Sequence, residues 1–385
     1  MNETQKSRTL SPSLDATAEL EKLRAQIDAV DRAILAQLNA RAHLAQAVGE
    51  VKRSAGVPVY SAGRERDVLA RLGAENAGPF PAAGVASVYC EIIAACRSLE
   101  APLRVAFLGP EGTHSHAAAR QQFGESAALE AVDSIAAIFA AVERGRADLG
   151  IVPVENSTEG VVTQTFDAFV DSDLTLCGEA VLRIGYHLLS KSGRLEDVRR
   201  VVSHPQGLAQ CRGWLDAHLP GVERSESAST AAAARLASQD DGVAALASPI
   251  AGEACGLQTI EASVEDRRDN TTRFLLIGRE APPPSGSDLT CAVFTVRKDA
   301  SGALYQLLEP FAKLGVNLTA IQARPIKGKP WEYLFYLDVE GHRSDPQVAR
   351  ALAEAAQRAH SHKVLGSFPR ASARPRRAPA ATGER

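Results

Sequence analysis

Three patterns of apolar and polar residues follow one another along the chain of 385 residues. From Glu19 to Lys52, apolar residues recur at steps of three, four or seven, which is typical of one face of a long helix. These residues are Leu20, Leu23, Ile27, Val30, Ile34, Leu38, Ala45 and Val48. A short charged helix is expected at about Arg64–Leu72, and a third helix follows "AGPFPAAG" and ends near Glu100. The first hundred residues are therefore predicted to be all α-helical, and a first helix of this length indicates a bundle or a dimer.

The next pattern is one of short β-rich runs separated by Ala-rich stretches. Strands are predicted at Arg104–Leu108, Gly150–Val154, Thr175–Leu189, Val243–Ala247 and Phe274–Ile277. This alternation is typical of an α/β domain. The Pro-rich segment "APPPSGSD" ends it.

The last pattern reads strand, helix, strand, strand, then a helix at Pro346–Ala359 and a strand at Lys363–Phe368. This order predicts a ferredoxin-like βαββαβ unit. The chain is thereby divided into three domains at 15–101, 103–280 and 288–369. The segments 1–14 and 370–385 are polar or biased towards Pro, Ala and Arg, and they are predicted to be disordered.

Composition narrows the class of protein. The net charge of −3 gives no reason to expect nucleic acid or an anionic membrane as a partner. The six cysteines form no C-x-x-C pair, and we interpret them as reduced residues of a cytoplasmic protein. Neither the polar N-terminus nor any later stretch is apolar for long enough to predict a secretion signal or a membrane span.

Two cations fall on the apolar face of the first predicted helix. On a wheel of about 100° per residue, Arg41 and Lys52 lie within about 20° of Ile34, and Arg24 lies at about 80°. Long basic side chains often reach solvent or pair with acids on another helix. Two unpaired charges on one buried face would be costly, however, so we expect an acidic ligand, most economically a small dicarboxylate. Arg24 points to a different side of the helix, which suits a site shared with another helix or another protomer.

Four polar clusters follow predicted strands in the middle segment. They are "GPEGTHS", "VPVENSTEG", "SHPQGLAQC" and "DNTTRF". Each one alone is most simply explained as a turn, because Asn and Ser side chains bond nearby backbone there. Four such clusters in one segment favour a functional site over ordinary turns.

The first segment, "ELEKLRAQIDAVDRAILAQLNARAHLAQAVGEVKRSAGVPVYSAGRERDVLARL", resembles the AroQ-type chorismate mutase domain. The resemblance implies a chorismate site made of Arg24, Arg41, Lys52, Arg64, Glu65 and Glu100. The rearrangement to prephenate is unimolecular, so catalysis would consist of holding two carboxylates and stabilising charge on the breaking ether oxygen. Lys52 and Glu100 are expected to act at that oxygen.

The polar clusters, in this order and spacing, resemble prephenate dehydratase, which has two α/β lobes like a periplasmic binding protein. Its reaction removes carbon dioxide and the ring hydroxyl to give phenylpyruvate. The resemblance implies that Thr272 lies next to the departing hydroxyl. The cleft is expected to be lined by Glu155, Asn156, Ser157, Thr158, Ser203, Gln206, Ser229, Thr230 and Arg273.

The last segment resembles an ACT domain, which in this family senses phenylalanine. The resemblance implies an effector site on two stretches, made of Gly302, Ala303, Leu304, Asn317, Leu318, Gln322 and Arg324. The usual Glu-Ser before Arg-Pro reads Gln322-Ala323 here. We therefore expect phenylalanine to bind more weakly than is usual for the family.

The order of the three domains resembles the bifunctional P-protein family of phenylalanine biosynthesis. This implies conversion of chorismate to prephenate and of prephenate to phenylpyruvate, with feedback by phenylalanine, no metal and no organic cofactor, in a homodimer or larger homo-oligomer. Two alternatives remain. Arogenate dehydratases differ only in the amine on the substrate, and a non-catalytic phenylalanine-responsive regulator would be expected to have lost charged residues such as Arg41 and Lys52.

Overall fold

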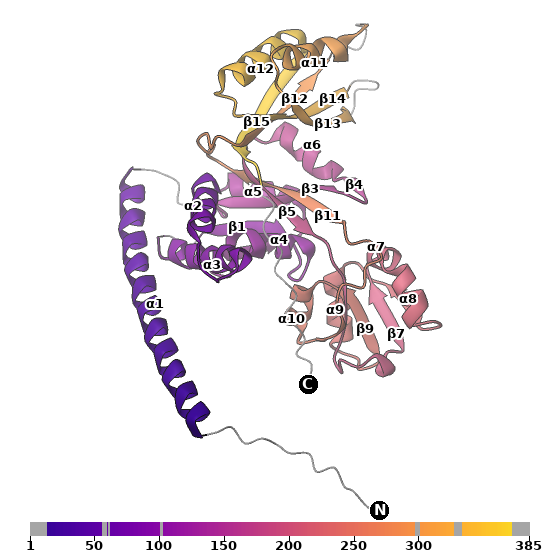
Figure 1. Cartoon of the computed structure of the whole chain (residues 1–385). Coiled ribbons are helices and arrows are strands. Elements are labelled where there is room, and N and C mark those ends of the chain that lie inside the picture. Colours follow the sequence, from indigo (N-terminus) through magenta and orange to yellow (C-terminus); the bar gives the residue numbers. More distant parts are fainter. Residues whose placement is uncertain are drawn as a thin grey trace, which may run out of the picture.

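The computed structural model describes residues 14–55, 60, 62–100, 103–296, 301–326 and 333–371. The terminal segments predicted to be disordered lie almost entirely outside these residues. Figure 1 shows three parts in chain order, namely a group of helices, a central pair of α/β lobes and a C-terminal α+β domain.

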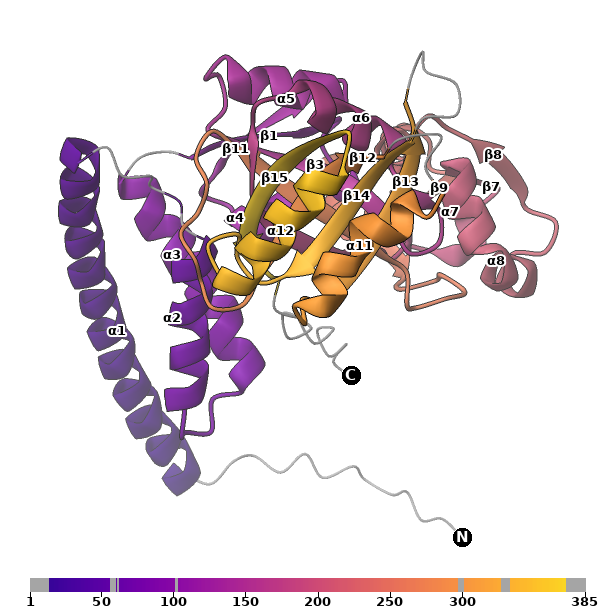
Figure 2. The ribbon, with the colours of Figure 1, turned by 90° about the horizontal axis from the view of Figure 1, so that it is seen from above.

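The helical domain consists of α1 (Leu14–Ala55), α2 (Ala62–Glu75) and α3 (Ala82–Glu100). Helix α3 packs against both others, whereas α1 extends well beyond them (Figures 1 and 2). The apolar face predicted for α1 is uncovered over much of its length, since Ile27 and Val30 are 59% and 58% exposed. The prediction of the helix is confirmed, but that face is about half exposed from Leu20 to Ile34.

Helix α3 is also long and apolar enough, by length and composition, to cross a membrane. A helix in the core of a domain can have the same length and composition. Contacts with α1 and α2, and with the first α/β lobe through Arg97, favour this second interpretation.

The first lobe is built on a six-stranded sheet in the order β2-β1-β3-β11-β5, with β4 paired to β3. The strands are β1 (Arg104–Leu108), β2 (Ala128–Val132), β3 (Leu149–Asn156), β4 (Gly160–Val161), β5 (Thr175–Arg183) and β11 (Thr271–Gly278). Its helices are α4 (His114–Phe123), α5 (Ile135–Glu143) and α6 (Thr163–Asp171). Strands β1, β2 and β3 are parallel, and β11 runs antiparallel between β3 and β5.

The second lobe has a five-stranded sheet in the order β10-β6-β9-β7-β8. Its strands are β6 (His187–Ser190), β7 (Arg200–Ser203), β8 (Glu223–Glu226), β9 (Val243–Ala247) and β10 (Gln258–Glu261). Its helices are α7 (Pro205–Gln210), α8 (Arg212–His218), α9 (Thr230–Ala237), α10 (Pro249–Cys255) and the short 3-10 helix Leu195–Asp197.

The chain passes between the lobes twice, after β5 and before β11. The β-rich run predicted at Thr175–Leu189 forms two strands, β5 and β6, which belong to different lobes. Ile184 and Tyr186 between them are buried, so the apolar run is continuous across the break.

The C-terminal domain has a four-stranded antiparallel sheet in the order β13-β14-β12-β15. Its elements are β12 (Asp288–Thr295), α11 (Ala303–Lys313), β13 (Leu318–Pro325), β14 (Tyr333–Glu340), α12 (Pro346–Arg358) and β15 (Ser361–Pro369). One face of the sheet packs on α11 and α12. The other face shares a core with the first lobe, where Leu289 and Cys291 lie in one cluster with Phe169 and Leu176. The C-terminal domain is therefore packed firmly on the first lobe.

Candidate active sites

A pocket of about 400 Å³ lies between α1, α2 and α3. It brings together five of the six residues predicted for the mutase site, namely Arg41, Lys52, Arg64, Glu65 and Glu100. The sixth, Arg24, does not line the pocket. It precedes Arg41 on α1 by about 25 Å, at 1.5 Å per residue.

The side chains that line the pocket carry an excess of positive charge, and apolar side chains line it as well. Its lining has four cationic and two acidic side chains, and it includes Leu44, Val48 and Ile93. Lys52 Nζ donates to Glu100 Oε2 at 2.9 Å, and the Glu100 side chain is only 12% exposed. Guanidinium and ammonium groups bind carboxylates through charge-assisted hydrogen bonds. The chemistry of the pocket therefore fits a small molecule that has two carboxylates and an apolar part.

Arg97 is a pocket residue that the sequence analysis missed. It lies on α3, is 5% exposed, and its guanidinium binds the carboxylate of Glu65. A buried arginine with a carboxylate partner cannot be recognised from residue spacing alone, because the partner is on another helix.

In the first lobe, the predicted residue Thr272 lies on β11 directly opposite Asn156 on β3. Asn156 Nδ2 donates to Thr272 Oγ1 at 2.8 Å and to Asn270 Oδ1 at 2.9 Å. Asn156 Oδ1 accepts from the backbone N–H groups of Thr158 and Glu159. Asn156 thus holds both the turn after β3 and the hydroxyl of Thr272, which is 8% exposed.

The same hydrogen-bond network extends to the second lobe. Ser157 Oγ donates to Asn270 Oδ1 at 3.3 Å, and Asn270 Nδ2 donates to Gln210 Oε1 at 2.8 Å. Asn270 and Gln210 lie in two of the polar clusters but were not among the predicted site residues. Glu155 and Thr158, at the end of β3 and in its turn, are exposed.

The four residues predicted in the second lobe lie at the carboxyl end of β7 and at the starts of α7 and α9. Ser203 is fully buried and its hydroxyl donates to the backbone carbonyl of Leu246 at 2.7 Å. Ser229 caps α9 by accepting from the N–H of Ala232. Gln206 lies on α7, three residues after Ser203, and Thr230 begins α9 directly after Ser229. The structure gives none of the four a hydrogen bond with Thr272 among the residues that it describes.

Arg273 lies apart from this group. Successive side chains of a strand point to opposite faces, so Arg273 points away from the face of Thr272. Its guanidinium pairs with Glu179 at 2.9 Å and with Asp338 of β14 at 2.5 Å. Burial alone would lower the pKa of Arg273, but these carboxylates outweigh burial and raise it. Arg273 therefore joins the first lobe to the C-terminal domain.

His114 is another residue that was not among the predicted site residues. It begins α4, its ring meets the edge of Tyr186 at 5.7 Å, and its Nε2 is buried with no hydrogen-bond partner in the described chain. Burial lowers its pKa to about 4. His114 is therefore neutral at physiological pH.

The predicted effector residues fall on two elements of the C-terminal domain. Gly302 precedes α11 with a φ of 75°, and Ala303 and Leu304 begin that helix. Asn317 precedes β13, and Leu318 and Gln322 lie on this edge strand. Arg324 of the same strand pairs with Asp167 of α6 at 3.1 Å.

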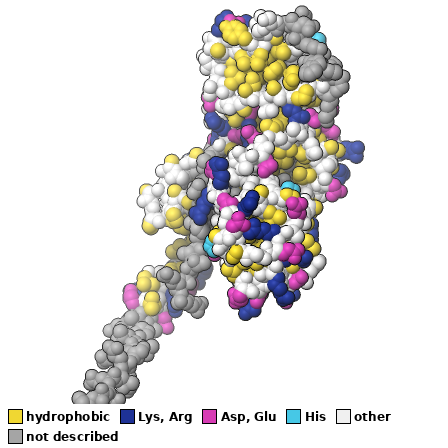
Figure 3. All heavy atoms as spheres, turned by 90° about the vertical axis from the view of Figure 1, so that its right-hand side faces the viewer, with side chains coloured by type: hydrophobic (Ala, Val, Ile, Leu, Met, Phe, Trp, Pro, Cys, Tyr) yellow, Lys and Arg dark blue, Asp and Glu magenta, His cyan; other side chains and the backbone are white. Residues whose placement is uncertain are grey.

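The surface of the C-terminal domain differs from that of the lobes. On the face seen in Figure 3, apolar side chains gather on the upper part of the molecule, whereas basic and acidic side chains mix below. The exposed large apolar residues of the C-terminal domain are Leu304, Tyr305, Ile321 and Tyr333. Among the described residues, no group of three or more His, Cys, Asp and Glu side chains is placed to hold a metal.

A positively charged helical pocket, a polar network in a two-lobed α/β domain and a C-terminal α+β domain are together typical of a multidomain enzyme that acts on small acidic molecules. Family models match all three parts: chorismate mutase type II at 23–101, prephenate dehydratase at 105–282 and the ACT domain at 292–357. A bifunctional chorismate mutase/prephenate dehydratase of Aquifex aeolicus is 44% identical over 357 residues, covering 92% of this chain and 98% of the relative. The chain belongs to the family of bifunctional chorismate mutase/prephenate dehydratases.

Solved structures resemble the part of the chain after the helical domain. A prephenate dehydratase from Arthrobacter aurescens, described in complex with L-Phe, is 36% identical with a TM-score of 0.64, and the match covers 70% of this chain and 90% of that one. A protein described as GqqA, a novel type of quorum quenching acylase, is 33% identical with a TM-score of 0.65, covering 70% of this chain and 98% of that one.

The protein is accordingly an enzyme of phenylalanine biosynthesis with two activities. Its mutase rearranges chorismate to prephenate, and its dehydratase converts prephenate to phenylpyruvate.

Proposed function

We propose that the pocket between α1, α2 and α3 is the chorismate site. Arg41 and Arg64 bind the two carboxylates of the substrate, and the apolar side chains of the pocket contact its ring. The observation that carries this proposal is the excess of positive charge in a pocket of about 400 Å³, in a domain that matches chorismate mutase. The reaction needs no nucleophile, so binding the reactive conformer supplies much of the catalysis.

Within that site, Lys52 donates a hydrogen bond to the ether oxygen as the bond breaks. Glu100 supports this role, because its carboxylate holds Lys52 Nζ at 2.9 Å. A donor fixed before the reaction stabilises developing negative charge without having to reorganise. Glu65 accepts a hydrogen bond from the hydroxyl group of the substrate.

Arg24 contributes to a site formed with a second copy of the chain. It lies too far along α1 to reach the pocket of its own protomer. The uncovered apolar face of α1, with Leu23, Ile27 and Val30 about half exposed, supports a homodimer in which this helix packs on the partner.

In the dehydratase domain, Thr272 donates its hydroxyl proton towards the departing ring hydroxyl. A threonine hydroxyl has one donor and two acceptor positions. Asn156 occupies an acceptor position of Thr272 Oγ1, which leaves the proton of Thr272 directed elsewhere. The cleft residues Ser157, Gln206 and Thr230 then bind the polar groups of prephenate.

The C-terminal domain binds phenylalanine and lowers dehydratase activity. The match to the ACT domain and the phenylalanine complex described for the Arthrobacter dehydratase support this role. Gln322 and Ala323 make the binding weaker than in relatives with Glu-Ser. We also place the enzyme in the cytoplasm, since all six cysteines are free in the structure.

The deciding experiment is turnover of chorismate, prephenate and arogenate by the full-length protein. We expect chorismate to be converted to phenylpyruvate through prephenate, with kcat/KM for prephenate well above that for arogenate. A higher kcat/KM for arogenate would establish an arogenate dehydratase. Absence of turnover with all three substrates, in protein that still binds phenylalanine, would establish a non-catalytic regulator.

A further inference from the structure

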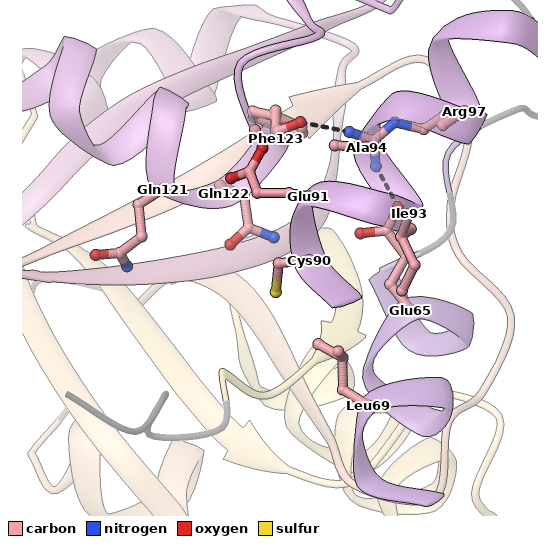
Figure 4. Close-up of a pocket in the computed structure, with 11 residues that line it drawn as sticks. Glu65, Leu69, Cys90, Glu91, Ile93, Ala94, Arg97, Gln121, Gln122 and Phe123 are labelled. Atoms are coloured by element: carbon pink, nitrogen blue, oxygen red, sulfur yellow. Dashed lines mark hydrogen bonds and ion pairs between the residues drawn. The ribbon is translucent and has the colours of Figure 1, made fainter. Parts of the chain in front are cut away.

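Arg97 lies where the mutase domain meets the dehydratase domain. One of its terminal nitrogens binds Glu65 in the mutase pocket, and the other donates to the backbone carbonyl of Phe123 at 2.7 Å. Phe123 is the last residue of α4 in the first lobe. Figure 4 shows the guanidinium between these two partners, with one dashed line to each.

The surroundings of Arg97 fix the end of α4 against α3. The guanidinium lies 5.4 Å from the centre of the Tyr60 ring, and Tyr60 contacts the Phe123 ring at 5.3 Å. Gln122 donates to the Tyr60 hydroxyl at 2.9 Å. A Cβ added to Gly124 would lie 2.5 Å from Ala94 Cβ on α3, so only glycine permits this approach. The two domains are therefore in close contact at this point.

A buried guanidinium needs its partners. Leaving such a charge without a carboxylate or carbonyl is strongly unfavourable, so Arg97 and its two acceptors hold one another in place. Glu65 lines the mutase pocket together with Arg41 and Lys52. The position of a pocket carboxylate thus depends on an arginine that is anchored on the other domain.

We infer that Arg97 is a positioning residue of the mutase reaction, and that the dehydratase domain holds it in place through α4. Arg97 fixes the carboxylate of Glu65 for the substrate, and the Phe123 carbonyl fixes Arg97. The mutase domain consequently reaches full activity only when the first lobe is docked on α3. This inference rests on the proposed role of the pocket as the chorismate site.

The test is a double-mutant cycle in the full-length protein with Arg97→Met and Glu65→Gln. We expect Arg97→Met alone to lower mutase kcat/KM about 10- to 100-fold, as for loss of a charge-assisted hydrogen bond. In the Glu65→Gln background the same change should lower it less than about threefold, because coupled residues are not additive. Dehydratase turnover of added prephenate should stay within about twofold of wild type, and Arg71→Met, on the exposed side of α2, serves as the matched control.

Arg97→Lys keeps the charge but lacks the fork that reaches two acceptors, and it should give an intermediate loss. Equal effects of Arg97→Met in both backgrounds, or equal loss of both activities in all Arg97 variants, would overturn the inference. Wild-type mutase activity in Glu65→Gln would instead contradict the proposed role of Glu65 in the pocket.

A second experiment places a substitution in the dehydratase domain only. Gly124→Ala should lower mutase kcat/KM about threefold or more, since the added Cβ pushes α4 away from α3. Gly221→Ala controls for backbone strain, because Gly221 also has a positive φ, of 83°, but has no atom within 4 Å of an added Cβ. Unchanged mutase activity in folded Gly124→Ala would overturn the dependence on the dehydratase domain.

Discussion

The pocket between α1, α2 and α3 and the Thr272 network are held together by different physical means. The pocket gathers charged side chains from three helices, and cationic side chains outnumber acidic ones among them. The network consists of neutral side chains on adjacent strands that already bond one another, as Asn156 does with Thr272 and Asn270. Sheet pairing fixes the positions of these groups within the lobe. The helical pocket instead depends on how three separate helices pack together.

The largest effect is expected where that charge excess is reduced. Arg41→Ala should lower mutase kcat/KM by about 10²–10³-fold, the range for loss of one fixed electrostatic contact in an active site. Dehydratase activity, measured with added prephenate, should remain within about twofold of wild type. An equal loss of both activities in a folded variant would mean that the two reactions share one site.

Within the Thr272 network, loss of the Thr272 hydroxyl should have the largest effect on dehydratase activity. Thr272→Val is nearly isosteric and should lower dehydratase kcat by about 10²-fold or more, as for a positioned proton donor, with mutase activity intact. Thr272→Ser, which keeps the hydroxyl, should retain most of the activity. Wild-type kcat in the valine variant would remove Thr272 from the mechanism.

Docking of helices can be tested on the uncovered face of α1. Ile27→Asp should convert the proposed dimer to monomer in sedimentation velocity and lower mutase kcat/KM about tenfold or more, while dehydratase activity persists. Burying an unpaired carboxylate in an apolar interface is strongly unfavourable. Ala29→Asp, on the opposite side of the helix, is the control. A wild-type oligomer with Ile27→Asp would show that this face is not the interface.

A smaller effect is expected in the C-terminal domain. The double change Gln322→Glu with Ala323→Ser should tighten phenylalanine binding several-fold in calorimetry, because a carboxylate adds a charge-assisted acceptor for the amino group of the ligand. Absence of binding heat even in this variant would contradict an effector role for the domain.

The smallest effect concerns pH and His114. Its pKa is about 4 in the folded protein against 6.5 for an unperturbed histidine. Between these pH values the unfolded chain binds more protons, so stability falls as pH falls, by at most about 1.4 kcal/mol per pH unit from this group. His114→Phe keeps the ring and removes the titration.

The stability of His114→Phe relative to wild type should therefore rise as pH is lowered from 6.5 towards 4 and stay constant above 6.5. Urea unfolding at three pH values measures this difference, and His360→Phe, at an exposed position, is the control. A difference that does not change with pH would contradict the burial of a neutral imidazole.

Elements with a strong local pattern were predicted well from sequence. The bounds of β1 and β9 agree with the prediction because each is a short apolar run ended by turn residues. The break between β5 and β6 was missed, since nothing local marks a change of sheet within a continuous apolar run. Contacts between distant residues were also missed: Gln210 bonds Asn270 across 60 positions. Spacing can place charges on one helix face, but it cannot identify a partner on another element.

Arg273 has a consequence for how far a regulatory signal must travel. Its ion pair with Asp338 attaches the C-terminal sheet to β11 at the residue next to Thr272. Consecutive Cα atoms are about 3.8 Å apart, so Arg273 and Thr272 are separated by one peptide unit. We expect a displacement of β14 to reach β11 through this ion pair, without a relay of intervening side chains.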